Sequence, residues 1–127
     1  MKRFALLSVF ALSACATGSG TLELAASRWQ LENAAGTRPE LIFATEGKLT
    51  GSTGCNPMQG TYQVDGDSLR LNDLSTAAHM PCNDTEPGRE AQVLDTLRQV
   101  RHYRVDKGVL VLMGADGAVL PRYLPSY

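Results

Sequence analysis

The stretch that decides the fold reads Gly51-Ser-Thr-Gly-Cys-Asn-Pro-Met-Gln-Gly-Thr-Tyr62. It combines three glycines, a cysteine, an Asn-Pro turn and the start of an alternating strand. Glycine is favoured where the backbone needs a positive φ or passes close to another segment, and it is unfavourable elsewhere. We therefore expect a loop over Gly54–Gly60, with a strand restarting at Thr61.

The N-terminus carries an export signal. Two basic residues at positions 2 and 3 precede a nine-residue apolar run, Phe4–Leu12, which only Ser8 interrupts. A membrane-spanning helix needs about 20 apolar residues, whereas a run of this length is typical of a secretory signal peptide. The following Leu-Ser-Ala-Cys, ending at Cys15, resembles a bacterial lipobox. That resemblance implies cleavage before Cys15 and lipidation of Cys15, with palmitate among the expected acyl chains.

Two alternatives to this cleavage stay open. Ala14-Cys15-Ala16 also satisfies an Ala-x-Ala rule, so ordinary secretion is one, and an uncleaved anchor is the other. Ala16 in place of Asp implies sorting to the outer membrane. The division we predict is a signal peptide (1–14), a lipid-anchored tether (15–21) and one domain (22–124), which is held at the outer membrane and faces the periplasm.

The cysteine count agrees with this division. Three cysteines in an exported chain leave one odd thiol, and lipidation of Cys15 removes it. We predict a disulfide between the remaining pair, Cys55 and Cys82, closing a loop of about 28 residues that contributes roughly 3.5 kcal/mol. A redox-active or metal-bound pair is the alternative, although the usual C-x-x-C spacing is absent.

Charge and composition argue against several classes of function. The full chain has a net charge of −1, and loss of Lys2 and Arg3 leaves 10 basic against 13 acidic residues, or about −3. We therefore expect no nucleic-acid partner. The chain has two histidines and no Gly-x-Ser-x-Gly motif, so we predict no enzyme, catalytic residue or cofactor. His102 is expected to be a helix C-terminal cation or a surface residue.

The candidate ligands for a metal ion are poorly placed to bind one. A metal site would combine Cys55, His79, Cys82 and Asp84. His79 and Cys82 stand three apart on an extended segment, so their side chains point to opposite faces. We therefore predict no metal.

Alternation of apolar and polar residues predicts strands through most of the chain, with Trp29 as a core anchor. The strands are expected over residues 27–32, 40–44, 48–52, 61–65, 68–72, 78–80, 103–105, 109–113 and 118–120, with a corner over 73–77. Apolar residues at three- to four-residue spacing predict a single amphipathic helix over 87–100. A sheet of this size curls to bury one face, and the helix covers or plugs the opening. Pro121 is expected to end the last strand or lie at an edge, because it cannot donate to the ladder.

Several of these segments resemble a known family. Gly51, Gly54 and Asn56 around Cys55, then Gly60-Thr61-Tyr62, then Met80-Pro81-Cys82 ahead of the helix look like the META domain of HslJ-like bacterial lipoproteins. The resemblance runs from Trp29 to about Leu120. It implies an α+β fold, a strongly curved antiparallel sheet (an incomplete barrel of seven to eight short strands) with one helix. It implies bridged cysteines and no established enzymatic activity, and a loose similarity to pilot lipoproteins.

Function follows less directly from these observations. Our first hypothesis is a non-enzymatic, lipid-anchored envelope protein, a binding or assembly and stress-tolerance module of the outer membrane, with an envelope protein or an apolar ligand as partner. The alternative is a periplasmic inhibitor or chaperone-like cap that acts through an exposed loop such as residues 83–88.

Overall fold

A computed structural model describes residues 24–34, 36–76 and 88–126 of the chain. Most of its regular structure is β-strand. In chain order the strands are β1 (Ser27–Leu31), β2 (Glu40–Phe43), β3 (Lys48–Ser52), β4 (Pro57–Asp65), β5 (Ser68–Thr76), β6 (His102–Asp106), β7 (Val109–Met113) and β8 (Tyr123–Pro125). A single 3₁₀ turn, η1 (Thr45–Gly47), links β2 to β3, and the helix α2 (Arg89–Arg98) lies between β5 and β6.

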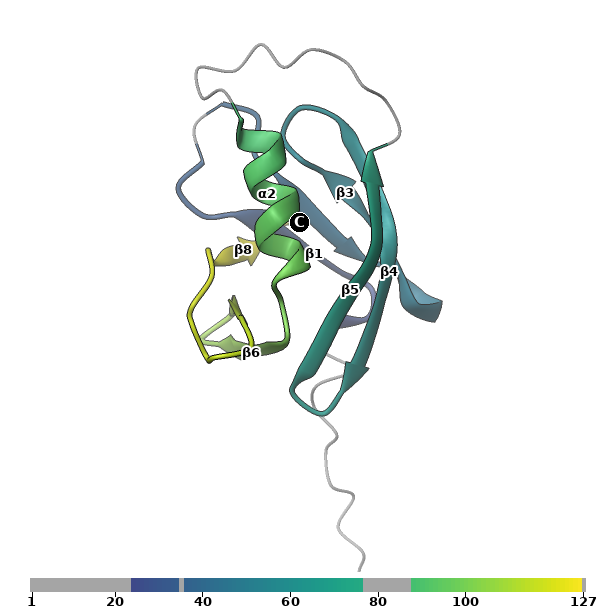
Figure 1. The fold of residues 1–127 in the computed structure, drawn as a ribbon, viewed down its shortest axis with the longest axis vertical. Coiled ribbons are helices and arrows are strands. Elements are labelled where there is room, and N and C mark those ends of the chain that lie inside the picture. Colours follow the sequence, from purple (N-terminus) through teal and green to yellow (C-terminus); the bar gives the residue numbers. More distant parts are fainter. Residues whose placement is uncertain (1–23, 35, 77–87, 127) are drawn as a thin grey trace, which may run out of the picture.

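The eight strands form one strongly curved antiparallel sheet. Each strand pairs with the next, and β8 returns to pair with β1, so the sheet closes into a ring (Figure 1). Two joints are thin, since β5 meets β6 only at Ser68–His102 and β7 meets β8 only at Leu110–Tyr123. The predicted α+β class is confirmed: a strongly curved, ring-like antiparallel sheet with one helix in the described chain.

Helix α2 packs where the ring is weakest. Its apolar residues Val93 and Leu97 are buried, and it lies beside β5, across the part of the sheet that β6 leaves unpaired (Figure 1). The helix was predicted over 87–100 and is observed over Arg89–Arg98. Gly88 precedes it with a φ of +84°. No helix in the described ranges is long and apolar enough to cross a membrane.

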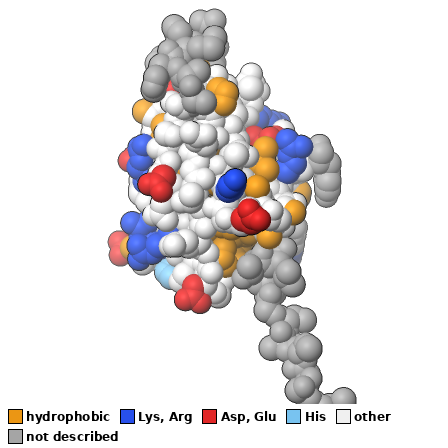
Figure 2. All heavy atoms as spheres, turned by 90° about the vertical axis from the view of Figure 1, so that its right-hand side faces the viewer, with side chains coloured by type: hydrophobic (Ala, Val, Ile, Leu, Met, Phe, Trp, Pro, Cys, Tyr) orange, Lys and Arg blue, Asp and Glu red, His pale blue; other side chains and the backbone are white. Residues whose placement is uncertain are grey.

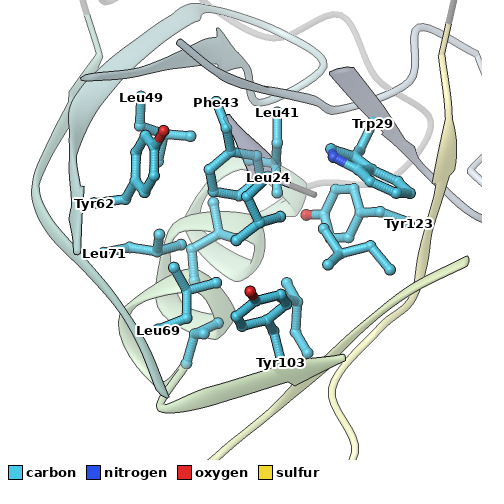
Figure 3. Close-up of a cluster of buried hydrophobic side chains, with 14 of the residues drawn as sticks. Leu24, Trp29, Leu41, Phe43, Leu49, Tyr62, Leu69, Leu71, Tyr103 and Tyr123 are labelled. Atoms are coloured by element: carbon cyan, nitrogen blue, oxygen red, sulfur yellow. The ribbon is translucent and has the colours of Figure 1, made fainter. Parts of the chain in front are cut away.

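The interior of the ring is occupied by its own side chains. Trp29, the predicted core anchor, is 6% exposed, and its Nε1 donates a hydrogen bond to Ser27 Oγ at 2.7 Å. Figure 3 shows aromatic and leucine side chains from opposite strands meeting in this space. Members of this cluster include Leu24, Trp29, Leu41, Phe43, Leu49, Tyr62, Leu69, Tyr103, Leu110 and Tyr123.

Strands β4 and β5 are longer than predicted. The expected loop over 54–60 ends early, because Pro57 already pairs with Ser52 at the start of β4. The expected corner over 73–77 is absent as far as Thr76. Asp73 instead takes a φ of +55° where a register shift lies opposite, between Gln59 and Thr61, and the strand continues past it. A β-bulge thus replaces a turn.

The end of the sheet also differs from prediction. Of residues 118–120, only Val119 forms an isolated bridge, to Met113. The last strand, β8, follows Pro121 rather than preceding it. A proline cannot donate to a ladder, but it does not prevent a strand from starting two residues later. The strand expected over 78–80 lies outside the described residues.

Candidate functional site

Residues 51–62, which we call the clasp, bring the ends of β3 and β4 against β2 and β5. A Cβ atom at Gly51 would lie 2.0 Å from the carbonyl oxygen of Glu40 on β2. A Cβ atom at Gly60 would lie 2.8 Å from the carbonyl oxygen of Asn72, at the bulge. Both glycines therefore allow backbone segments to approach more closely than any side chain permits. Gly54 lies in the turn between the strands and is buried.

A buried polar network ties the clasp to the first turn of α2. Thr53 and Asn56 are 0% and 1% exposed. Thr53 Oγ1 and Asn56 Nδ2 each donate to Oε1 of Glu90 at 2.9 Å. Thr53 Oγ1 also accepts from the backbone N–H groups of Cys55 and Asn56, at 3.3 and 3.1 Å. The carboxylate thus satisfies two donors that burial removes from water.

Sequence reasoning found Asn56 but missed Thr53 and Glu90. The two signals available were an acidic residue in the first helical turn and a threonine three residues before an asparagine. Neither signal indicates that the two segments touch, since Thr53 and Glu90 are 37 positions apart.

Tyr62, the last clasp residue, belongs to the core. Its ring stands perpendicular to that of Phe43, with centroids 5.0 Å apart, and its hydroxyl donates to the carbonyl oxygen of Ala44 at 2.6 Å. Burial raises the pKa of this hydroxyl above its ordinary value. The residue joins β4 to the end of β2.

Of the three cysteines, Cys55 alone lies among the described residues. Cys55 is half-buried in the clasp. Its Sγ accepts from Asn56 Nδ2 at 3.5 Å. Cys15 and Cys82 lie outside the described residues, so lipidation of Cys15 and the pairing of Cys55 with Cys82 stay predictions.

His102 does not lie where it was expected. It is the first residue of β6, half-buried between Ser68 and Met113, rather than a cation at the helix end or a surface residue. Its Nδ1 is buried and has no hydrogen-bond partner among the described residues. Within the same ranges no three His, Cys, Asp or Glu side chains gather as they would to hold a metal ion. Of the rejected metal set, residues 79, 82 and 84 lie outside the described part.

One hollow with partly apolar walls lies on a flank of α2. We call it the α2 groove; its volume is about 240 Å³. Leu31, Val93 and Tyr123 supply apolar surface, and Arg89 and Thr96 supply polar groups from the helix. Burial raises the pKa of Tyr123 strongly.

An ion pair stands at the rim of the α2 groove. Arg122 Nε and Nη2 reach the carboxylate oxygens of Glu32, which lines the groove, at 2.8 and 3.1 Å. This fork joins β8 to the end of β1.

Two further hollows lie near the other end of α2. One, of about 250 Å³, lies between residues 70–74 of β5 and the arginines Arg98 and Arg101. The other, of about 270 Å³, lies between Gln99 and the turn after β7. On the face shown in Figure 2, apolar side chains occur in small groups among charged ones.

Known proteins resemble this chain in sequence and in fold. The model of a family described as the META domain matches residues 21–126. A protein from Burkholderia xenovorans, solved by NMR, superimposes with a TM-score of 0.71 at 18% identity, covering 99% of both chains. A DUF4847 family protein from Bacteroides vulgatus gives a TM-score of 0.64 at 16% identity, covering 83% of this chain and 96% of that one. No curated protein matches. At such identities the structures show a shared fold.

Proposed function

We propose that this chain, which belongs to the META domain family, is a lipid-anchored envelope protein whose domain binds another envelope protein without catalysing a reaction. The observation that carries the proposal is the combination of a ring filled by its own side chains with a partly apolar hollow on its outer surface, the α2 groove. The polar residues of the clasp hold the fold together. We infer that contact with a partner occurs on the outside of the ring.

The size of the α2 groove favours a protein over a small apolar ligand. Sites that enclose small molecules have volumes of about 300–1,000 Å³ and bury most of the ligand. The groove, at about 240 Å³, is smaller and open. Protein interfaces are dominated by a few anchoring side chains that fill such hollows. The occupant we propose is an apolar side chain of the partner, with its backbone near Arg89 and Thr96 at the helix.

Anchoring is the part that rests on the sequence. Cleavage before Cys15 and acylation there would place the domain at the periplasmic face of the outer membrane, in a role in assembly or stress tolerance. The mass of the mature protein tests this directly. We expect a chain that starts at Cys15 and carries acyl groups. An unmodified chain starting at Thr17 would contradict it.

Two variants of α2 test the groove. Thr96 is half-buried in the α2 groove, whereas Ala91 is exposed on the same helix and does not line it. Thr96→Arg fills the groove, and Ala91→Arg adds the same side chain elsewhere. After chemical crosslinking in intact cells, we expect Thr96→Arg to lose an adduct that the wild type and Ala91→Arg both form. Loss of the adduct in both variants, or in neither, would reject the α2 groove as the contact.

The cap hypothesis, with a loop over 83–88 as the acting segment, has no specific observation in its favour. Of that loop only Gly88 is among the described residues.

A further inference from the structure

Where the ring is thin, β5 has an edge with which no other described strand pairs. The N–H of Leu69 donates to the carbonyl oxygen of Arg101 at 3.0 Å, and the N–H of Tyr103 donates to that of Asp67 at 3.0 Å. Beyond Leu69, no backbone hydrogen bond joins β5 to β6 within the described chain, yet β5 continues to Thr76. Figure 1 shows this upper part of β5 with α2, rather than another strand, on that side.

The direction of the free backbone groups follows from the pairing. Leu69 turns its N–H toward β6, so the same alternation turns the N–H and C=O of Leu71 to that side, away from β4. Leu71 lines the hollow of about 250 Å³ between β5 and the end of α2, which we call the arginine hollow. An extended segment entering this hollow would find a strand edge to pair with.

Positive charge is concentrated in the same place. Arg70, Arg98 and Arg101 line the arginine hollow, and Asp73 is the one carboxylate among its lining residues. Arg70 and Arg98 are exposed, and neither forms an ion pair with any described residue. The chain as a whole has a net charge of −1, so this local excess runs against the overall balance.

One of the three guanidinium groups is already fixed. Arg101 Nη1 donates to the carbonyl oxygens of Arg98 and Val100 at 3.0 and 2.7 Å, and its other guanidinium donors form no hydrogen bond with a described residue. Basic residues in or just after the last turn of a helix also stabilise its C-terminus, which accounts for Arg98 and Arg101 by themselves. It does not account for Arg70, which lies on β5.

We infer that the arginine hollow binds a short, acidic, extended segment of a partner protein. The segment pairs with the free edge of β5 at Leu71 and places its carboxylates beside Arg70, Arg98 and Arg101. Main-chain pairing supplies affinity in such strand addition, and the side chains supply specificity. Arginine pairs with carboxylates through two parallel hydrogen bonds, which suits it to this role. This site lies on the other flank of α2 from the α2 groove and extends the proposed function to the chemistry of the partner.

The test is a titration of the mature protein in non-ionic detergent, followed by NMR of its backbone amides. The probe is a short blocked peptide of alternating Glu and Thr, and the control peptide has Gln in place of Glu. We expect the acidic peptide to shift the amides of residues 70–74 with saturation, and the Gln peptide to bind far more weakly. No shift at these amides up to the solubility of the peptide, or equal binding of the two peptides, would overturn the inference.

Two matched pairs of variants distinguish binding at the arginine hollow from a general effect of positive charge. Arg70→Gln with Arg98→Gln removes two charges from the arginine hollow, and Arg104→Gln with Lys107→Gln removes two exposed charges elsewhere. We expect about a tenfold loss of affinity in the first pair, since each exposed ion pair contributes up to about 1 kcal/mol, and no change in the second. Equal losses in both pairs would overturn the inference. If the protein with Arg70→Gln and Arg98→Gln does not fold, Arg98→Gln alone should lower the affinity for the acidic peptide about threefold.

A lipid headgroup offers similar charge, so the same sample is titrated with a short-chain anionic phospholipid. We expect no saturable shift at residues 70–74. Saturable binding of the phospholipid that needs Arg70 and Arg98, without binding of the acidic peptide, would overturn the inference in favour of a lipid surface. The amide shifts of residues 70–74 report neither on lipidation of Cys15 nor on the α2 groove. A failure of this inference can therefore be distinguished from a failure of the proposed function.

Discussion

A single carboxylate joins the clasp to the helix. Glu90 accepts hydrogen bonds from two side chains that are almost fully buried, Thr53 and Asn56. Without the carboxylate these donors would be left with longer contacts, Thr53 Oγ1 with the carbonyl oxygen of Asn56 at 3.3 Å and Asn56 Nδ2 with Cys55 Sγ at 3.5 Å. The cost of leaving a buried donor unsatisfied is about 1–3 kcal/mol, more than the net contribution of an ordinary hydrogen bond. We therefore expect the stability of the fold to depend on the side chain at position 90.

Substitution of Glu90 tests this arrangement. We expect Glu90→Ala to lower the free energy of unfolding by about 1–3 kcal/mol, because two buried donors exchange a charged acceptor at 2.9 Å for longer and weaker contacts. Glu90→Gln should lower it less, since an amide oxygen still accepts. Urea unfolding followed by the fluorescence of Trp29 measures both. The matched control is Gln92→Ala, an exposed position on the same helix, which should change little. Equal effects at 90 and 92 would show that the network contributes nothing.

Tyr123 gives the domain a predictable response to alkali. Its phenol points into the core cluster (Figure 3), and burial raises its pKa well above the ordinary value of about 10. Above pH 10 the unfolded chain therefore loses a proton that the folded chain keeps. Stability is unaffected by this group below pH 10 and falls above it, by up to about 1.4 kcal/mol per pH unit.

The Tyr123→Phe variant tests this response, because it lacks the ionisable hydroxyl. Urea unfolding at several pH values from 8 to 11 should show a shallower loss of stability in the variant than in the wild type. Parallel curves would contradict the account of this residue.

At the scale of elements, the pairing of β2 with β3 depends on one missing side chain. Gly51 faces Leu41, and any Cβ there would overlap the carbonyl oxygen of Glu40. That obstacle is backbone, so it cannot move aside as a flexible side chain would.

Gly51→Ala should therefore cost at least about 3 kcal/mol of unfolding free energy, in the range of severe single substitutions. The control is Gly114→Ala, where the nearest atom to a new Cβ would be 3.7 Å away, an ordinary contact. Urea unfolding of the two variants decides the matter. A Gly51→Ala protein as stable as the Gly114→Ala protein would show that the strands separate without cost.

Local pattern predicted the elements whose signals are local. The alternation around Trp29 and the spacing of Val93 and Leu97 in α2 correspond to observed elements within two residues at each end. One error arose where a residue typical of turns lies within a strand. Asp73 reads as a corner, but it occupies the positive-φ position of a bulge, which only the partner strand makes visible.

The candidate sites were less predictable because they join distant parts of the chain. Asn56 and the clasp glycines stand out in the sequence, yet the contact of Thr53 with Glu90 needs the fold to exist. The same holds for Arg70 and Arg98, which are ordinary surface arginines until β5 and α2 lie side by side.

For the whole molecule, the filled ring limits where the proposed binding could occur. Eight strands enclose a core of their own side chains, and on the outer surface α2 separates a partly apolar hollow from a basic one. Our proposal therefore places the contact with a partner on this outer surface. With the lipid at Cys15, this surface would be held within reach of other envelope proteins.

The most direct test of this account is photocrosslinking in living cells from a photoreactive amino acid placed at Thr96, with Ala91 as the reference position. The account predicts that position 96 forms an adduct with one defined envelope protein, and that position 91, on the same helix but away from the α2 groove, does not. The same adducts from both positions, or none from position 96, would contradict it.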